Sequence, residues 1–181
     1  MTMSKTNASK WDYTFNAKYY SKRPNYSFDA IKELCEYIQV KKDDGYVIAD
    51  IGAGTRNLTM LLSQFVNNII CIEPNQAMRE IGIDRTRNFP NVKWAVGFGE
   101  NTNLASNSIN LVAFGSSFNT TNRTAALKES HRILRDGGYF SCMWNNRDLD
   151  DPIQKKIEEI IKIFVPNYSH GTRREPQADF I

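Results

Sequence analysis

The feature that most constrains the fold is a short apolar run that ends in a glycine-rich turn and leads into a helical pattern. Residues 46–51 are rich in β-branched side chains and are followed at once by Gly52-Ala53-Gly54-Thr55. β-Branched runs favour strands, and apolar residues at spacings of three and four are typical of an amphipathic helix. That spacing follows the turn, at Leu58, Leu61, Leu62, Phe65 and Val66. The chain therefore contains a strand, a tight turn and a helix.

The same alternation of strands and helices continues along the chain. Further strands are predicted over residues 69–72, 92–96, 109–114 and 139–144. Further helices are predicted to begin at Ser27, Asn75, Asn122 and Asp151, and Gly137-Gly138 is expected to end the third of these near Arg135. Because parallel neighbours need a crossover that a helix supplies, the pattern predicts a three-layer, Rossmann-like α/β fold with a doubly wound sheet.

Composition limits the class of protein. The chain has 181 residues, of which 41% are hydrophobic and 24% are charged, as expected for a single globular domain. Its net charge of +3 is too small to indicate nucleic-acid binding, and the pair Arg173-Arg174 after His170 is interpreted as a solvated loop. Without a long apolar stretch, secretion and membrane spanning are not expected, so the predicted location is the cytoplasm.

The three cysteines, Cys35, Cys71 and Cys142, are odd in number and widely spaced. They are interpreted as small core residues in a reducing compartment, so neither a disulfide nor a metal site is expected.

Aromatic residues crowd the N-terminal part of the chain. They are Trp11, Tyr13, Phe15, Tyr19, Tyr20 and Tyr26. Such a cluster favours a segment that folds over an apolar surface, for which a ligand pocket is one candidate. The predicted organisation is therefore an aromatic lid segment at 1–26, a ligand-binding domain at 27–165, and a loop or the start of a C-terminal part at 166–181.

Two carboxylates mark the candidate site. In open α/β sheets, ligands bind outside the carboxyl ends of the strands, where the first strand feeds its glycine-rich turn. Asp50 ends that strand and can accept a hydrogen bond from a ligand ammonium. Glu73 follows the next strand about twenty residues after the turn, a position suited to both hydroxyls of an adenosine ribose. A surface carboxylate near a helix N-terminus is the simpler alternative for Glu73.

Taken together, these segments resemble the class I S-adenosylmethionine-dependent methyltransferases, particularly their small-molecule, type 11-like branch. The matching segments are 47–59, 70–75, 96–101 with Leu104, 107–112, 126–129 and 132–138. The resemblance implies S-adenosylmethionine as cofactor, S-adenosylhomocysteine as product, and methyl transfer to an O, N, C or S atom of a small molecule. We expect a monomer or homodimer, and charge and hydropathy predict neither nucleic-acid nor membrane partners.

The resemblance also assigns residues to the two sides of the site. The implied cofactor-binding residues are Asp50, Gly52, Ala53, Gly54, Glu73, Pro74, Phe98, Gly99, Glu100 and Gly115. The substrate-side candidates are Tyr20, Arg23, Phe118, Asn119 and Asn145. Methyl transfer from a sulfonium needs positioning more than a dedicated base, so His131 is expected to be structural.

The chain departs from the family pattern in two places. Arg56 stands where the family has a third glycine; if this position needs a positive φ, arginine costs about 1–2 kcal/mol. The Arg56 side chain could occupy the methionine site, or it could pair with the cofactor carboxylate. The two strands that usually finish the family's sheet have no counterpart here. A catalytically impaired methyltransferase-like binding protein is therefore the alternative, and a nicotinamide-dependent oxidoreductase fits less well because Asn57 occupies the sixth position of the glycine motif.

Overall fold

The computed structural model describes residues 12–145, 148 and 150–168. The chain divides into two compact units, Met1–Trp144 and Asn145–Ile181. The first unit contains, in chain order, η1 (Ala17–Lys22), α1 (Phe28–Tyr37), β1 (Val47–Ile51), α2 (Asn57–Leu62), β2 (Asn68–Ile72), α3 (Gln76–Thr86), β3 (Val92–Ala95), β4 (Ile109–Gly115), η2 (Phe118–Thr120), α4 (Arg123–Ile133) and β5 (Leu134–Met143). The second unit contains α5 (Pro152–Phe164).

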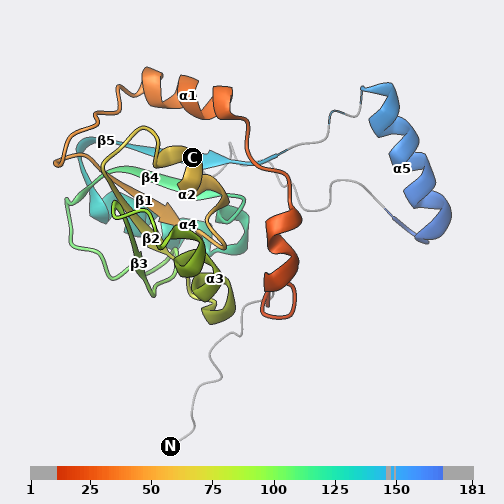
Figure 1. Cartoon of the computed structure of the whole chain (residues 1–181), viewed down its shortest axis with the longest axis horizontal. Helices are drawn as coiled ribbons and strands as arrows, with labels where there is room; N and C mark the ends of the chain where they lie inside the picture. Colours follow the sequence, from red (N-terminus) through yellow and green to blue (C-terminus); the bar gives the residue numbers. More distant parts are fainter. Residues whose placement is uncertain (1–11, 146–147, 149, 169–181) are drawn as a thin grey trace, which may run out of the picture. The chain divides into compact units, whose positions relative to one another are not determined.

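The five strands of the first unit form one parallel sheet in the order β3-β2-β1-β4-β5 (Figure 1). Asp50 near the end of β1 pairs with Cys71 of β2 on one side and with Ala113 of β4 on the other. The chain order reverses between β1 and β4, so the switch point lies where these strands end. The predicted doubly wound α/β sheet is confirmed, and it brings the turns after β1, β2 and β4 to one edge.

Helices cover both faces of the sheet, which gives three layers. On one face, Ile31 and Cys35 of α1 and Leu58 and Leu62 of α2 pack in one core cluster with Ile48 of β1. On the other face, α4 and η2 pack against the alternate residues of the strands. This second cluster comprises Ala49, Ile51, Ile72, Ile109, Val112, Phe114, Phe118, Ala126 and Ile133. Strands buried on both faces explain the near-continuous apolar runs in the sequence.

The predicted boundary between α4 and β5 is wrong. The helix ends at Ile133, and Leu134 is already extended and pairs with Ile109 of β4. The register then shifts, so that Leu111 pairs with Tyr139. Gly137, at a φ of +74°, lies within this irregular stretch. The glycine pair therefore accommodates a bulge inside the strand, and it does not end the helix.

Helix α2 is shorter than its apolar pattern predicts. It ends at Leu62, although Val66 is also buried in the core. The backbone N–H groups of Gln64 and Phe65 donate to Leu61 and Leu62, which are turn-type bonds. Burial of the predicted residues is thus correct, whereas their conformation after Leu62 is a series of turns.

The second unit begins its helix as predicted. The side chain of Asp151 caps α5 by accepting from the backbone N–H groups of Ile153 and Gln154, each at 2.9 Å, and Pro152 occupies the first helical turn. The Tyr168 hydroxyl donates to Oε1 of Glu158 at 3.1 Å, which connects the segment after the helix to α5. The domain bounds 1–26, 27–165 and 166–181 stay predictions.

Some expectations concern single residues. Cys35 and Cys71 are buried, Cys142 is half-buried, and all three are free thiols. Among the described residues, no helix is long and apolar enough to cross a membrane. The interpretations of Trp11, His170 and Arg173-Arg174 lie outside the described residues.

Candidate functional site

The turn after β1 needs glycine at two positions. Gly52 and Gly54 have φ angles of +69° and +59°, which side chains disfavour. A Cβ on Gly52 would also lie 2.5 Å from the Cβ of Ser117, in the loop after β4. The Ser117 hydroxyl donates to the Ile51 carbonyl at 2.5 Å. Glycine at position 52 therefore lets the loops after β1 and β4 approach each other closely.

Asp50 is a fully buried carboxyl group at the end of β1. Its Oδ2 accepts a hydrogen bond from the Thr59 hydroxyl at 2.7 Å, whereas its Oδ1 has no partner among the described residues. Burial, and to a smaller extent the charge of Glu73, raises the pKa of Asp50 to about 7. A buried acceptor without a donor destabilises the protein, so this oxygen is suited to an incoming cation or N–H group.

Glu73 follows β2 and is buried between two turns. Its Oε2 accepts from the backbone N–H of Gly54 at 2.8 Å, and its Oε1 accepts from the backbone N–H of Asn75 at 2.8 Å. Burial raises the pKa of Glu73, and these two hydrogen bonds oppose that rise. Since each carboxylate oxygen can accept more than one bond, both can still take a donor from a ligand.

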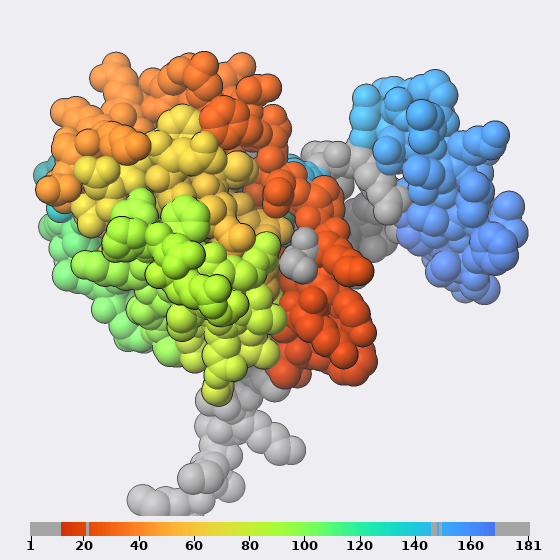
Figure 2. Space-filling model, viewed as in Figure 1, coloured from red at the N-terminus to blue at the C-terminus, as the bar shows by residue number. Residues whose placement is uncertain are grey.

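The N-terminal segment is attached to the first turn of α3. Asn75 caps that helix, because its Oδ1 accepts from the backbone N–H of Met78 at 3.0 Å. The amide of the same side chain donates to the Thr14 hydroxyl at 2.9 Å. Figure 2 shows the red N-terminal segment lying directly against the segment that contains α3. The predicted lid thus lies beside the turn that carries Glu73.

Two tyrosines of the N-terminal segment contact the site loops. The ring of Tyr20 lies over Gly54, within 3.6 Å of where a Cβ would be. Arg23 donates to the Tyr20 hydroxyl at 2.6 Å, and its guanidinium stacks on the ring at 4.9 Å. The Tyr26 hydroxyl forms a 2.9 Å hydrogen bond with the Ser116 hydroxyl after β4, and burial raises the pKa of Tyr26 to about 12. The neutral Tyr26 side chain therefore connects the N-terminal segment to the sheet edge.

The segment after β3 forms a tight turn. The backbones of Phe98 and Asn101 exchange hydrogen bonds of 2.9 and 3.1 Å. Oε1 of Glu100 accepts from the backbone N–H of Asn122, the cap of α4, at 2.6 Å. Phe98 is 57% exposed, so its ring is free to face a ligand. The Glu100 carboxylate anchors this turn to α4.

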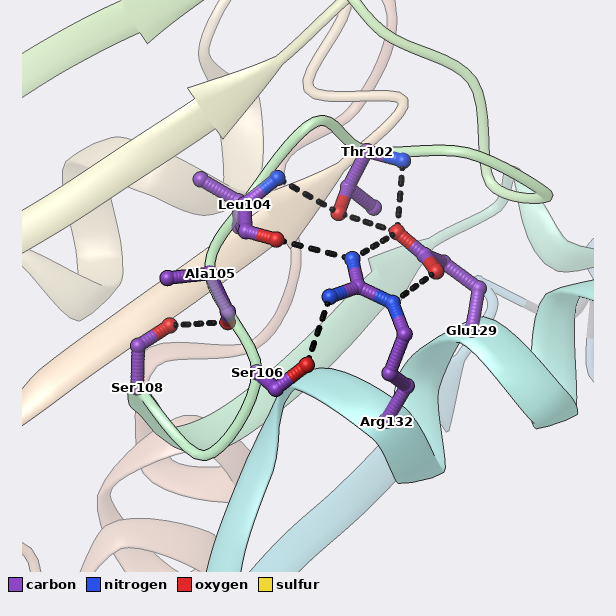
Figure 3. A network of polar contacts seen from close by, with 7 residues as sticks. All are labelled: Thr102, Leu104, Ala105, Ser106, Ser108, Glu129 and Arg132. Atoms are coloured by element: carbon purple, nitrogen blue, oxygen red, sulfur yellow. Dashed lines mark hydrogen bonds and ion pairs between the residues drawn. The ribbon is translucent and has the colours of Figure 1, made fainter.

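An ion pair on α4, between the buried Glu129 and the exposed Arg132, holds the residues that follow this turn (Figure 3). Oε1 of Glu129 accepts from the Thr102 backbone N–H at 2.8 Å and from the Thr102 hydroxyl at 2.6 Å. Arg132 binds both Glu129 oxygens and donates to the Leu104 carbonyl at 2.8 Å and to Ser106 at 3.0 Å. These contacts lower the pKa of Glu129 to about 2. Helix α4 thus fixes both ends of the segment between β3 and β4.

The substrate-side candidates lie in different surroundings. Phe118 is fully buried and packs against Phe114 and Phe140 at centroid distances of 5.3 and 5.5 Å, so the structure does not bring it to the site. The amide oxygen of Asn119 accepts from the indole N–H of Trp144 at 3.2 Å. Asn145 belongs to the second unit.

Arg56 adopts the conformation that its position in the glycine motif predicts. Its φ is +90°, in the left-handed region. Its Nε is buried and has no partner among the described residues. Burial lowers the pKa of Arg56, and the positive charge of Arg85 lowers it further. The charge that acts on the Arg56 guanidinium therefore comes from α3 and not from Asp50 or Glu73.

Two polar residues of the site are absent from the sequence-based prediction of its residues. Thr59, on the first turns of α2, supplies the hydrogen bond to Asp50, and Asn75 joins α3 to the N-terminal segment. Tyr26 belongs to the predicted aromatic segment, but the sequence does not identify its partner Ser116, which is 90 residues away. A hydroxyl residue early in the helix after the glycine turn is the one local signal that could have identified Thr59.

The sequence of this chain is similar to those of known methyltransferases. A family model described as a methyltransferase domain matches residues 49–142. An uncharacterized methyltransferase of Schizosaccharomyces pombe is 29% identical over 147 residues, which are 81% of this chain and 57% of that protein. A ubiquinone/menaquinone biosynthesis C-methyltransferase of Rubrivivax gelatinosus is 32% identical over 101 residues, 55% of this chain and 39% of that protein. The chain spans about half the length of the curated relatives it matches.

Solved structures share the fold. A crystal structure from Methanococcus maripaludis, described as an S-adenosyl-L-methionine-dependent methyltransferase, superposes with a TM-score of 0.66 at 19% identity, covering 92% of this chain and 77% of that one. Geranyl diphosphate C-methyltransferase of Streptomyces coelicolor gives a TM-score of 0.57 at 14% identity, covering 72% and 52% of the two chains. The likeness of fold agrees with the sequence match over more than half of the chain. The chain belongs to the class I S-adenosylmethionine-dependent methyltransferases.

Proposed function

We propose that this chain binds S-adenosylmethionine at the carboxyl edge of its sheet and transfers the methyl group to a small molecule. The observation that carries the proposal is the position of Glu73, whose carboxylate is buried and bonded to the backbone N–H of Gly54. An acidic side chain bonded to the glycine turn is suited to an adenosine ribose, because both ribose hydroxyls can donate to it.

The donors and acceptors at the sheet edge fit the cofactor. Asp50 offers its unpartnered Oδ1 to the ammonium group of the methionine part, directly or through one water. The backbone of Gly52, Ala53 and Gly54, with Gly115 and Pro74 at the borders, would pass beneath the ligand. The exposed ring of Phe98 and the backbone of Gly99 and Glu100 would border the adenine.

Catalysis by this chain would consist of positioning and exclusion of water. The bound cofactor supplies an electrophilic methyl group on a sulfonium, which an acceptor attacks in line. Tyr20 over Gly54 and Tyr26 on Ser116 would cover the site from the N-terminal side. Arg23 and Asn119 are the remaining side chains proposed to face the acceptor. Effective molarity alone contributes about 7–11 kcal/mol to such reactions, so no dedicated base is required.

A small-molecule acceptor is the class that the relatives favour. One is named as a C-methyltransferase of ubiquinone and menaquinone biosynthesis, and another, of similar fold, as a geranyl diphosphate C-methyltransferase. The choice among O, N, C and S as acceptor atoms stays a prediction.

Calorimetry tests this proposal. We expect S-adenosylmethionine and S-adenosylhomocysteine each to bind with a stoichiometry of one, and reduced nicotinamide cofactor to give no heat. Absence of binding at millimolar S-adenosylmethionine would overturn the proposal. Binding of the nicotinamide cofactor alone would assign the site to the oxidoreductase alternative.

A further inference from the structure

Arg56 occupies a backbone conformation that its side chain disfavours. Its φ of +90° and ψ of 12° lie in the left-handed region, at the residue before α2. A residue other than glycine loses about 1–2 kcal/mol of stability in this region, so the conformation persists only where surrounding contacts hold it.

Two of the contacts that hold the backbone of Arg56 in this conformation are local. The backbone N–H of Arg56 donates to the Ala53 carbonyl at 3.0 Å, and the Arg56 carbonyl accepts from the backbone N–H of Met60 at 3.0 Å. The φ and ψ of a residue are set by the peptide planes on its two sides, so these bonds fix one atom of each plane. The peptide between Thr55 and Arg56 also carries the Thr55 carbonyl, and neither of these two bonds satisfies that oxygen.

The remaining contact comes from α3. Nη1 of Arg85 donates to the Thr55 carbonyl oxygen at 3.1 Å and to the Thr55 hydroxyl at 3.1 Å. The Thr55 side chain is buried, so this guanidinium holds a group that is shielded from water. The Thr55 carbonyl belongs to the peptide that leads into Arg56. A residue 30 positions away from Thr55 therefore orients the plane that sets the φ of Arg56.

Ion pairing does not account for the position of Arg85. No carboxylate of the described residues forms an ion pair with it, whereas Arg87, two residues later, pairs with Asp84 at 3.2 Å on the surface. Arg85 instead lies near another cation, Arg56, which is electrostatically unfavourable. Arg79 of the same helix also donates to main-chain carbonyls, those of Glu73 and Pro74. Two arginines of α3 thus bind the backbone of the two turns that form the site.

We propose that Arg85 is a positioning residue that keeps the glycine turn in its ligand-binding path although Arg56 replaces the third glycine. Its hydrogen bonds to Thr55 supply the constraint that a glycine at position 56 would make unnecessary. The inference rests on the proposed role of the turn in cofactor binding. It predicts that the importance of Arg85 depends on the residue at position 56.

A double-mutant cycle tests this dependence. The variants are Arg85→Gln, Arg56→Gly and the double variant, with Arg87→Gln, at the C-terminal cap of the same helix, as the matched control. With arginine at position 56, Arg85→Gln weakens S-adenosylhomocysteine binding about tenfold in calorimetry, a size typical of coupled neighbours. With glycine at position 56, the same substitution weakens binding by less than about twofold, and Arg87→Gln has no effect in either background. Equal losses in both backgrounds, or no loss from Arg85→Gln, would overturn the proposal.

Thermal unfolding of the natural chain, the two single variants Arg85→Gln and Arg56→Gly, and the double variant tests the same dependence without a ligand. Arg85→Gln should lower the melting temperature more with arginine at position 56 than with glycine. If Arg85→Gln does not fold, folding of the double variant supports the proposal, and failure of both variants to fold contradicts it. If the natural chain binds no S-adenosylhomocysteine, the proposed function fails, and this melting-temperature cycle still decides the role of Arg85.

Discussion

The backbone N–H of Gly54 donates to Oε2 of Glu73 at 2.8 Å. This bond joins the turn after β1 to the turn after β2, two strands that pair directly from Val47 and Asn68 to Ile51 and Ile72. The carboxylate is therefore placed by main-chain geometry, with little freedom to rotate. A ligand that binds Glu73 therefore lies beside the glycine turn, so the two motifs form one candidate site, which we propose to bind adenosine.

Replacement of Glu73 by glutamine should weaken ligand binding. A side-chain amide has one oxygen, so the glutamine could not accept from Gly54, Asn75 and two ribose hydroxyls together. Hydrogen bonds to charged groups contribute about 1.5–3 kcal/mol, so affinity for S-adenosylhomocysteine should fall about 10- to 100-fold in calorimetry. Glu80→Gln, on the exposed side of α3, is the control and should bind normally. Unchanged affinity of Glu73→Gln would contradict the assignment.

Binding should depend on pH through Asp50. Its pKa is raised from 3.8 to about 7, so the empty protein holds a proton there under mildly acidic conditions. A ligand ammonium favours the ionised carboxylate, so the affinity for S-adenosylhomocysteine should rise about tenfold from about pH 6 to about pH 8. Calorimetry in buffers of different ionisation enthalpy would detect the released proton.

Asp50 should also make the stability of the ligand-free protein depend on pH. Because the folded pKa of Asp50 lies above its unfolded value, ionisation destabilises the fold, and stability decreases as pH rises from about 4 to about 7. Asp50→Asn removes the titrating group and should flatten this dependence as well as that of binding. If Asp50→Asn keeps the natural pH profile of affinity, another group is responsible.

Arg56 should affect all adenosine ligands equally. Among charged groups, Arg85 lowers the pKa of Arg56 and neither carboxylate of the site affects it, so we expect its guanidinium not to pair with the methionine part. Arg56→Gln keeps a side chain at the same φ and removes only the charge. Its affinities for S-adenosylhomocysteine and for 5′-methylthioadenosine, which lacks the carboxylate, should change by the same factor in competition titrations. A selective loss for S-adenosylhomocysteine would show pairing with the carboxylate, and a selective gain would show obstruction.

Glu129 should stabilise the fold above acidic pH. Its pKa is lowered from 4.5 to about 2, mainly by Arg132, so its contribution is complete above the unfolded value and is lost as pH falls from about 4.5 to about 2. Glu129→Gln should cost about 1–3 kcal/mol at neutral pH, because Thr102 and Arg132 lose a charged partner. In urea unfolding the difference should shrink between about pH 5 and about pH 3. The exposed Glu36→Gln is the control, and a difference that does not vary with pH would refute this account.

Local sequence patterns were sufficient to predict the parallel sheet and the edge of the sheet at which the candidate site lies. The β-branched run before Gly52 and the acidic residue after β2 are read within single segments, and strand pairing then brings them together. The boundary at Leu134 could not be predicted in this way. It depends on the pairing of Leu134 with Ile109 across the sheet, which tolerates the irregular stretch around Gly137.

Contacts between distant segments account for the rest of what sequence reasoning left out. The positive φ of Arg56 follows from its place in the glycine motif, but the approach of Arg85 from the far end of α3 does not. The same holds for Tyr26 and Ser116. The family resemblance predicts Phe118 on the substrate side of the site, yet its side chain packs in the core against Phe114 and Phe140. Which side of a short turn a ring occupies is decided by packing, not by spacing.

The most direct test of the central claim is an amide-resolved NMR titration of the natural chain with S-adenosylhomocysteine. The account predicts saturable shifts of the amide signals of Gly52, Gly54, Asn75 and Gly99, which surround the proposed adenosine site, and no shifts for exposed residues of α4 such as Lys128. Abolition of these shifts by Glu73→Gln would tie them to the carboxylate. No saturable shifts at millimolar ligand, or shifts confined to residues away from the carboxyl ends of β1 and β2, would contradict it.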